Sequence, residues 1–231
     1  PLVGAVSSST VQMLYRPSAK SQTLRLRVFD ANDQMVKTVS SDCLVERDFV
    51  AHFTISGLQP AMTYEYQIER IGDVPEVLVE AGPAHHFTTA NQQRTGERVV
   101  VSFVSCVDVE PTAIWNEMEK LKVDAVCLMG DTPYIDSSDL GVARKKHRQF
   151  LQMPDLARLG QTTAVVGIWD DHDFGKNNGN GLNLVEGKPR TRQAFVNYRA
   201  HDRYGTGREG VYHKMDLGAL EIFFLDPRYF S

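Results

Sequence analysis

Long hydrophobic runs are missing from this sequence of 231 residues, and no stretch approaches the roughly 18 apolar residues of a membrane-spanning helix. Positive charge is also scarce, because 25 Lys and Arg face 29 Asp and Glu, and the net charge of −4 argues against general nucleic-acid binding. Cysteine occurs only three times, at scattered positions, which excludes a disulfide framework. These absences argue against a transmembrane protein, a nucleic-acid-binding protein and a small disulfide-rich protein.

The composition that remains is that of a soluble globular protein, with 42% hydrophobic and 23% charged residues, and the length suits one large domain or two ordinary ones. Residues 1–91 show short alternating segments separated by turn-forming residues, which predicts a β-sandwich of the fibronectin III or immunoglobulin-like type. Leu58, Tyr64 and Tyr66 match the loop leucine and strand tyrosine that fill such a sandwich. The strands are expected at residues 11–15, 24–29, 50–55, 64–68 and 85–89.

Residues 90–97 are polar and lack aromatic side chains, which predicts a linker. The pattern then changes to alternating strands and helices, which predicts an α/β domain over residues 99–231 with its chemistry at the carboxyl ends of the strands. The predicted strands span residues 99–104, 124–129, 163–169, 211–216 and 220–225. Helical patterns begin at Pro111, with apolar residues at Ile114, Met118 and Leu121, and recur near residues 142–160 and 190–203. The predicted fold class is therefore mixed, a β-sandwich followed by an α/β domain.

Three of the predicted strands are followed directly by donor side chains. The donors after the runs at 99–104, 125–130 and 164–169 are, in order, Cys106 and Asp108; Asp131, Tyr134 and Asp136; Asp170, Asp171 and His172. Charged groups at the ends of buried strands are costly unless a cation neutralises them. Because parallel strands bring their carboxyl ends to one edge of a sheet, the sequence predicts one shared metal site.

The types of donor indicate which cations fit the site. Carboxylates and a tyrosinate suit hard ions, and the thiolate of Cys106 beside a tyrosinate favours ferric iron over magnesium.

Several of these side chains have a structural alternative. Asp108 and Asp136 could orient ligands or substrate, or could simply be solvated. Arg228 could pair with Asp226 or clamp a substrate phosphate, and the structural pairing is the preferred interpretation. The basic run at residues 144–148 is expected to be a solvated helix face.

Four motifs occur in a fixed order along the chain. They are Ser105-Cys106, Gly130-Asp131-x-x-Tyr134-x-Asp136, Trp169-Asp170-Asp171-His172-Asp173-Phe174-Gly175 and Leu225-Asp226-Pro227-Arg228. Together they resemble the alkaline phosphatase D family of metallophosphoesterases, which also places an immunoglobulin-like domain before the catalytic one. The resemblance covers nearly the whole chain, and the combination is specific although no single motif is.

This resemblance implies a dinuclear or larger metal centre, Fe(III) with Ca(II), with Zn or Mn as alternatives. By position, Cys106 and Tyr134 would bind the iron-type ion, Asp131 would bridge the metals, Asp171 would bind the second metal, and His172 would be catalytic near the leaving group. The residues expected to bind substrate or to support the ligands are Asp108, Asp170, Asn177 and Arg228. The implied substrates are phosphomonoesters and phosphodiesters, either small molecules or phospholipids, and the implied location is secreted, periplasmic or at the cell surface.

The wider superfamily completes its metal site with histidines in Gly-Asp-x-His or Gly-His-x-His contexts. None of the seven histidines here lies in such a context. We therefore expect a fragment that lacks the C-terminal part of the catalytic domain, present either in a longer chain or as a separate chain. Two other functions stay open on the sequence, a phospholipase-type phosphodiesterase and a non-catalytic binding protein with a relic site.

Overall fold

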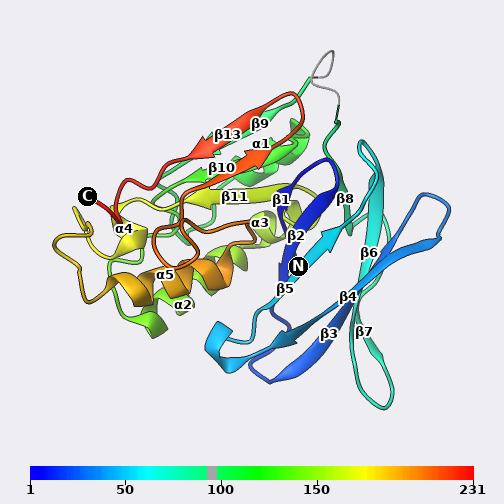
Figure 1. Cartoon of the computed structure of the whole chain (residues 1–231), viewed down its shortest axis with the longest axis horizontal. Coiled ribbons are helices and arrows are strands. Elements are labelled where there is room, and N and C mark those ends of the chain that lie inside the picture. Colours follow the sequence, from blue (N-terminus) through cyan, green and yellow to red (C-terminus); the bar gives the residue numbers. More distant parts are fainter. Residues whose placement is uncertain (93–97) are drawn as a thin grey trace.

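The computed structural model describes residues 1–92 and 98–231 (Figure 1). Its N-terminal half contains the strands β1 (Leu2–Val6), β2 (Thr10–Tyr15), β3 (Gln22–Phe29), β4 (Met35–Cys43), β5 (Ala51–Ser56), β6 (Thr63–Arg70), β7 (Glu76–Val79) and β8 (His86–Thr88), with the short helix η1 (Val45–Arg47) before β5. One antiparallel sheet has the order β1-β2-β5, and the other has the order β4-β3-β6-β7, with β8 paired to β6.

The sequence patterns predict five of these strands and miss β1, β4 and β7. Every residue of β1 is buried, and β4 is exposed along most of its length. Neither strand therefore shows the clear alternation of apolar and polar residues that reveals a strand with one buried face. β7 is only four residues long and half of it is exposed.

Leu58 and Tyr64 close one end of the sandwich as the sequence predicts. Both side chains are buried, and the Tyr64 hydroxyl accepts a hydrogen bond of 2.9 Å from the backbone N–H of Gln59. Tyr66 is buried too, but its hydroxyl donates a hydrogen bond of 2.8 Å to the carbonyl of Gln161 in the C-terminal half. Tyr66 thus connects the sandwich to the rest of the molecule.

The C-terminal half is built around a parallel sheet. Its elements are β9 (Val101–Val104), α1 (Ile114–Lys120), β10 (Ala125–Met129), α2 (Leu140–Leu151), α3 (Pro154–Leu159), β11 (Ala164–Ile168), α4 (Asp171–Phe174), α5 (Lys188–Tyr198), β12 (His213–Asp216) and β13 (Glu221–Phe224). The parallel sheet has the order β11-β10-β9, and β12 and β13 form an antiparallel pair. No helix of the described residues is both long enough and apolar enough to cross a membrane.

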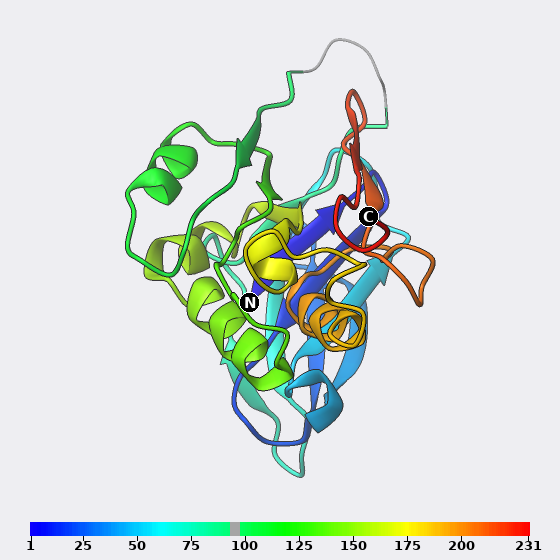
Figure 2. The same ribbon diagram turned by 90° about the vertical axis from the view of Figure 1, so that its left-hand side faces the viewer.

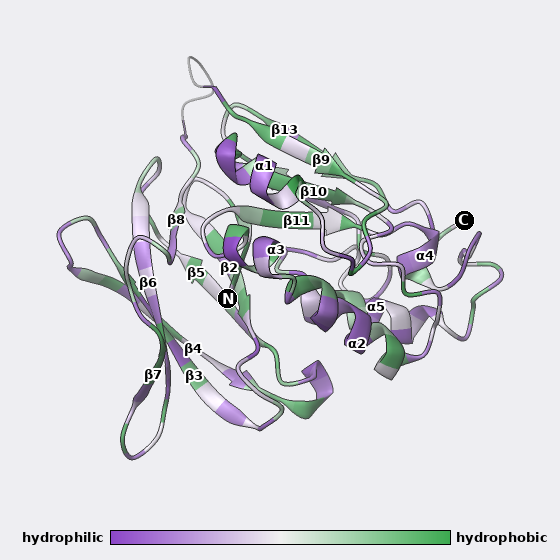
Figure 3. Cartoon of the chain, turned by 180° about the vertical axis from the view of Figure 1, so that it is seen from behind, coloured by the Kyte–Doolittle hydropathy of each residue, from purple (hydrophilic) through white to green (hydrophobic). Residues whose placement is uncertain are grey.

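Both faces of β10 and β11 are covered for most of their length, which is why these strands are almost entirely apolar (Figure 3). The face that carries Val126 and Val165 packs against α1, α2 and α3. The opposite face, with Cys127 and Val166, belongs to a cluster that also contains the sandwich core and Met215 of β12. The sheet therefore holds its carboxyl edge rigidly between two packed layers.

Two of the helical predictions need correction. The pattern near residues 142–160 forms two helices, because Met153 is extended and Pro154 begins α3, where a proline fits well but could not continue α2. Leu121 lies beyond the end of α1 and is exposed, whereas Trp115 and Met118 supply the buried face.

The N-terminal strand β1 joins the two halves. The backbone N–H of Val3 donates to the carbonyl of Gly160, and that of Ala5 donates to the carbonyl of Ala200, both at 2.7 Å. Between them, a Cβ atom on Gly4 would lie 2.1 Å from the carbonyl oxygen of Ala200, so only glycine allows this approach. The hydrophobic core is continuous across the predicted boundary. The division into residues 1–91 and 99–231 stays a prediction, and positions 93–97 of the predicted linker lie outside the described residues.

The basic run at residues 144–148 is not the solvated face that the sequence predicts. Arg144 donates to the carbonyl of Glu46, and Arg148 forms an ion pair with Asp48, both in the segment around η1. The prediction is wrong because the sandwich covers this face of α2, a contact between segments about 100 residues apart that local charge patterning does not reveal.

His213 of β12 gives the fold a dependence on pH. Its ring is buried between the rings of Phe224 and His201, at centroid distances of 4.4 and 3.8 Å, and burial lowers its pKa to about 4. The folded-state pKa lies below the unfolded value of about 6.5, so the unfolded chain binds more protons and stability falls as the pH drops from about 6.5 to 4. We expect His213→Phe to remove about 2 kcal/mol of the stability difference between pH 7 and pH 5 in urea denaturation. An unchanged difference would contradict this assignment.

Candidate metal centre

Three loops at the carboxyl ends of the parallel strands carry the predicted donors (Figure 2). Cys106 follows β9, Asp131 follows β10, and Asp171 begins α4 directly after β11. Donor atoms of Asp131, Asp171 and His172 all lie within 4.8 Å of one another. The Cys106 Sγ lies 3.8 Å from Asp131 Oδ2. The fold thus gathers these four side chains at one edge of the sheet, at the end of the molecule where α4 lies (Figure 1).

The backbone around these donors adopts a conformation that is rare for side chains other than glycine. Cys106 has φ of 58° and Asp131 has φ of 53°, in the left-handed region that costs of order 1 kcal/mol per residue. Gly130, with φ of 97°, passes so close to the next loop that a Cβ atom on it would lie 2.5 Å from the Cβ of Asp170. This glycine allows the loops after β10 and β11 to approach each other.

Backbone amides fix the carboxylates of the centre. The N–H of His172 donates to Asp131 Oδ1 at 3.3 Å, and the N–H of Asn178 donates to Asp171 Oδ2. At the start of α4 the N–H of Asp170 donates to Asp173 Oδ1 at 2.5 Å. The short helix and the loop after it therefore fix one oxygen of each carboxylate, Asp131 Oδ1 and Asp171 Oδ2.

His172 is oriented by Asp136. The His172 ring nitrogen Nδ1 lies 2.6 Å from Asp136 Oδ1, and because a carboxylate only accepts, Nδ1 carries the proton. The N–H groups of Ile135 and Asp136 both donate to the carbonyl of His172, at 3.0 and 2.9 Å. The Tyr134 ring lies 4.6 Å from the His172 ring, centroid to centroid. Asp136 is thus more than a solvated carboxylate, and it leaves Nε2 as the available nitrogen of His172.

The two central carboxylates have pKa values shifted in opposite directions. Burial, reinforced by the charges of Asp171 and Asp170, raises the pKa of Asp131. Burial would also raise the pKa of Asp171, but the hydrogen bond from the Asn178 N–H and the charge of Arg228 lower it overall. The negative charges of these neighbouring carboxylates are only partly neutralised by the protein, so a bound cation would stabilise them.

His172 and Tyr134 respond to the same negative charge. Burial alone would lower the pKa of His172, but the hydrogen bond to Asp136 and the surrounding carboxylates raise it overall. The pKa of Tyr134 is raised to about 12 by its hydrogen bond with Cys106, by burial and by the charges of Cys106, Asp131 and Asp108. Tyr134 therefore keeps its proton at neutral pH unless a cation displaces it.

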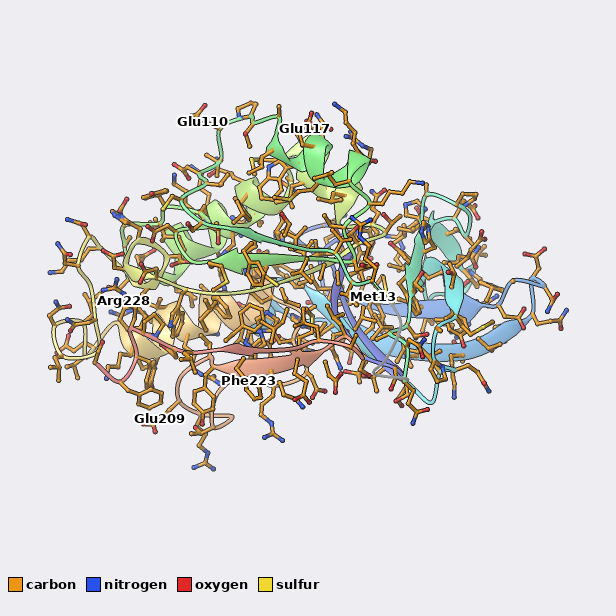
Figure 4. The ribbon with its side chains drawn as sticks, turned by 90° about the horizontal axis from the view of Figure 1, so that it is seen from above. Met13, Glu110, Glu117, Glu209, Phe223 and Arg228 are labelled. Atoms are coloured by element: carbon orange, nitrogen blue, oxygen red, sulfur yellow. The ribbon has the colours of Figure 1, made fainter. Side chains whose placement is uncertain are left out.

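Arg228 does not make the pairing with Asp226 that the sequence favours. Its guanidinium forms ion pairs with Asp170 and, at 3.5 Å, with Asp171, so Arg228 borders the candidate centre (Figure 4). Asp226 instead accepts hydrogen bonds from Trp169 Nε1 at 2.6 Å and from the backbone N–H of Arg228 at 3.1 Å. The motif residue Asp226 thus holds the turn that presents Arg228.

A fully buried arginine, Arg199, contacts the loop that carries Asp131. Arg199 donates to the carbonyl of Thr132 at 2.5 Å, and its charge faces Asp173, whose pKa burial raises to about 7. Burial lowers the pKa of Arg199 to about 10. Asp173 Oδ2, Arg199 Nε and Thr132 Oγ1 are buried without hydrogen-bond partners from the described residues, as expected where an ordered water bridges polar groups.

The remaining predicted residues lie farther from the cluster of Asp131, Asp171 and His172. Asp108 is half-buried, and both of its carboxylate oxygens lie 3.4 Å from Lys146 Nζ. Asn177 is exposed on the loop after α4, and it is the neighbouring Asn178 whose backbone contacts Asp171.

Sequence reasoning missed the parts played by Asp173, Arg199 and Lys146. Asp173 lies inside a recognised motif, so its spacing from Asp170 was an available signal for a helix start. Arg199 and Lys146 lie within helical patterns far from the motifs, and nothing local distinguishes them from other basic residues.

The donor set fits a hard, multivalent cation. Carboxylates of Asp131 and Asp171 and the imidazole of His172 converge within 4.8 Å, and the thiol of Cys106 and phenol of Tyr134 border them. The pKa values of three of these groups are raised, that of Asp131 by burial, that of Tyr134 by its hydrogen bond with Cys106 and by burial, and that of His172 by its hydrogen bond to Asp136, and nearby negative charge adds to each shift. A cation at this edge would act in the opposite direction and lower each of these pKa values.

No protein-family profile and no curated protein sequence matches this chain. Solved structures do match. PhoD superposes with a TM-score of 0.82 at 18% identity, over 99% of this chain and 51% of PhoD. The purple acid phosphatase PPD1 from yellow lupin (Lupinus luteus) seeds superposes with a TM-score of 0.70 at 11% identity, over 100% of this chain and 46% of that protein.

The chain therefore shares its fold with PhoD and with this purple acid phosphatase, and the PhoD-like fold is the one that the sequence resemblance predicts. The chain spans about half the length of the proteins that it matches. The similarity gives no support to the expectation of a separate C-terminal chain.

Proposed function

We propose that this chain contributes residues to a metal-dependent phosphoesterase site that hydrolyses phosphate esters. The observation that carries this proposal is the convergence of Asp131, Asp171 and His172 at the carboxyl edge of the parallel sheet. The fold similarity to two phosphatases supports it. The donors would be ordinary polar side chains in many folds, but here they meet at the edge where α/β proteins place their active sites.

The proposed ligands follow the resemblance residue by residue. Asp131 would hold both ions, Asp171 would hold the second ion, and Cys106 and Tyr134 would hold an Fe(III) ion beside Ca(II). Zn or Mn are the alternatives. The high pKa of Tyr134 agrees with this role, because only a strongly polarising cation would remove its proton near neutral pH.

When bound, such ions would neutralise the phosphoryl oxygens and lower the pKa of a water molecule near them. The residues of the chain supply the rest. Arg228, held by Asp170, places a guanidinium beside the cluster, where it can donate two hydrogen bonds to a phosphoryl group. The proton of His172 is fixed on Nδ1 by Asp136, so Nε2 is the nitrogen that would exchange a proton with the leaving group.

The wider assignments belong to the same proposal. The substrate is a phosphomonoester or a phosphodiester, and a phospholipid diester stays among the candidates because the metal ligands do not select between them. Asp108 and Asn177 border the site as substrate-binding or supporting residues. The resemblance favours an exported protein, secreted, periplasmic or at the cell surface, with residues 1–91 as a separate sandwich domain.

Metal analysis with an activity assay tests this proposal. Purified protein would be analysed for bound metals and then assayed with p-nitrophenyl phosphate and bis-p-nitrophenyl phosphate, before and after reconstitution with Fe(III) and Ca(II). Stoichiometric metal and hydrolysis of either ester support the proposal. Protein that takes up no metal under any of these conditions would instead favour the binding protein with a relic site.

Replacing Tyr134 with phenylalanine tests the iron ligand. We expect iron-loaded protein to absorb visible light through charge transfer from tyrosinate or thiolate to Fe(III), and we expect Tyr134→Phe to weaken this band by about half or more. Tyr212→Phe, at an exposed tyrosine, is the matched control and should keep the band. A band that survives Tyr134→Phe at full strength would remove Tyr134 from the ligand set.

A further inference from the structure

Lys146 differs from the other basic residues of α2. Arg144 and Arg148 turn toward the sandwich and Lys145 is exposed, but Lys146 Nζ lies 3.4 Å from both carboxylate oxygens of Asp108. Asp108 is two residues from Cys106 in the loop after β9, beside which α2 runs (Figure 2). The helical period explains this difference. Arg144 and Arg148 are four residues apart and share one face of α2, whereas Lys146 is two residues from each and lies on the opposite face.

The strand order places Lys146 and Arg228 on opposite sides of the candidate centre. Arg228 pairs with Asp170 after β11, Asp131 follows the middle strand β10, and Lys146 pairs with Asp108 after β9. Neighbouring strands lie about 4.8 Å apart, so the ends of the two outer strands are roughly 10 Å apart. A cationic side chain therefore stands at each end of the row of donors.

The two cations are not equivalent. The cluster of Asp131, Asp171 and His172 lies over the ends of β10 and β11, on the side of Arg228. A phosphoryl group bound at this cluster would lie within reach of Arg228. Lys146 contacts the loop after β9, the strand on the other side of β10, and among residues 1–92 and 98–231 Asp108 is its ion-pair partner, at a distance longer than a strong charged hydrogen bond.

We propose that Lys146 binds a second anionic group of the substrate, carried on the part that leaves when the phosphate ester is cleaved. This inference rests on the proposed function and adds a substrate class to it, a phosphate ester with a carboxylate or second phosphate about one strand spacing from the scissile phosphorus. An ammonium group has three donor hydrogens, so Lys146 can contact such an anion while it still contacts Asp108. Its side chain is 30% exposed, which leaves it accessible from the site.

Two matched ligands test this role. 3-Phosphoglycerate carries a carboxylate where glycerol 3-phosphate carries a neutral hydroxymethyl group, and their phosphate groups are otherwise alike. Binding of both would be measured by calorimetry with the metal-reconstituted protein, and hydrolysis of both would be measured beside it. We expect the wild-type protein to bind 3-phosphoglycerate about fivefold more tightly, and Lys146→Met to reduce this ratio to about one while glycerol 3-phosphate binding changes less than twofold.

Two further variants test whether Lys146 contacts the substrate or only holds the loop after β9 in place. Lys145→Met removes a neighbouring exposed charge and should keep the fivefold ratio. Asp108→Asn breaks the ion pair, so it should keep or increase the ratio if Lys146 contacts the ligand. If Lys146 only tethers the loop after β9, Asp108→Asn and Lys146→Met would weaken both ligands alike, and this result would overturn the inference.

The outcomes also separate this inference from the proposed function. Hydrolysis of both esters with no preference for the carboxylate in the wild-type protein would overturn the part played by Lys146 and leave the phosphoesterase proposal intact. Failure to bind or hydrolyse either ester, with the metals loaded, would overturn both.

Discussion

Replacement of Asp131 by asparagine is expected to weaken metal binding at least a hundredfold and to reduce any ester hydrolysis to background. Asp131 lies at the middle strand, where it receives the His172 N–H and approaches Cys106 and Asp171. An amide keeps the size of the side chain but removes the negative charge and half of the acceptor oxygens. Loss of a group that merely supports a ligand costs about 10–100-fold in metal affinity, so loss of a central ligand should reach at least the upper end of that range.

Calorimetric titration with Ca(II) and Fe(III), together with metal analysis after dialysis, would measure the effect of Asp131→Asn. Asp73→Asn, at an exposed site in the sandwich, is the matched control because it removes the same charge far from the site. The free energy of unfolding of the metal-free protein should hardly fall, since Asp131 is a buried carboxylate with a raised pKa that is costly to bury. Equal metal affinity in Asp131→Asn and wild-type protein would contradict the assignment of the metal site.

Arg199→Met is expected to lower the free energy of unfolding by about 3–5 kcal/mol. The change keeps the length and apolar stem of the side chain, but it removes the positive charge that acts on the buried Asp173, and leaving a buried charge uncompensated costs about this much. The carbonyl of Thr132 also loses a donor. Because Thr132 adjoins Asp131, we expect metal affinity to fall as well.

The loss of unfolding free energy caused by Arg199→Met should become larger as the pH rises. Burial raises the pKa of Asp173 above its unfolded value, and loss of Arg199 would raise it further. A folded-state pKa above the unfolded one means that stability is lost as the pH rises, so the difference from wild type should be larger at pH 8 than at pH 6. Urea denaturation at both pH values measures it. Arg203→Met, at an exposed arginine, controls for loss of charge, and Asp173→Asn in the Arg199→Met background should recover part of the loss.

The gathering of Cys106, Asp131 and Asp171 at one edge could be anticipated from the sequence because it follows from topology alone. Each residue comes directly after an apolar run, and parallel neighbours place such positions side by side. The tyrosine and leucine of the sandwich were predictable for a similar reason, since a short local pattern specifies a local hydrogen bond.

Contacts between distant segments could not be predicted in this way. Arg199 meets Thr132 across 67 positions, and Arg148 meets Asp48 across 100. Lys146 and Arg148 are two positions apart and look alike in the sequence, but one faces the donors and the other faces the sandwich. Which basic residue supports the site depends on the packing of α2, and a single sequence does not encode that packing in its charge pattern.

The position of β1 has a consequence for the order in which the molecule forms. Residues 2–6 contact residues about 160 and 200 positions away, through the hydrogen bonds of Val3 to Gly160 and of Ala5 to Ala200. Pairings between such distant points close long loops, which raises the contact order and slows two-state folding. During synthesis β1 must therefore wait for Ala200 before its neighbours are complete, and until then its apolar side chains are open to chaperones and to aggregation.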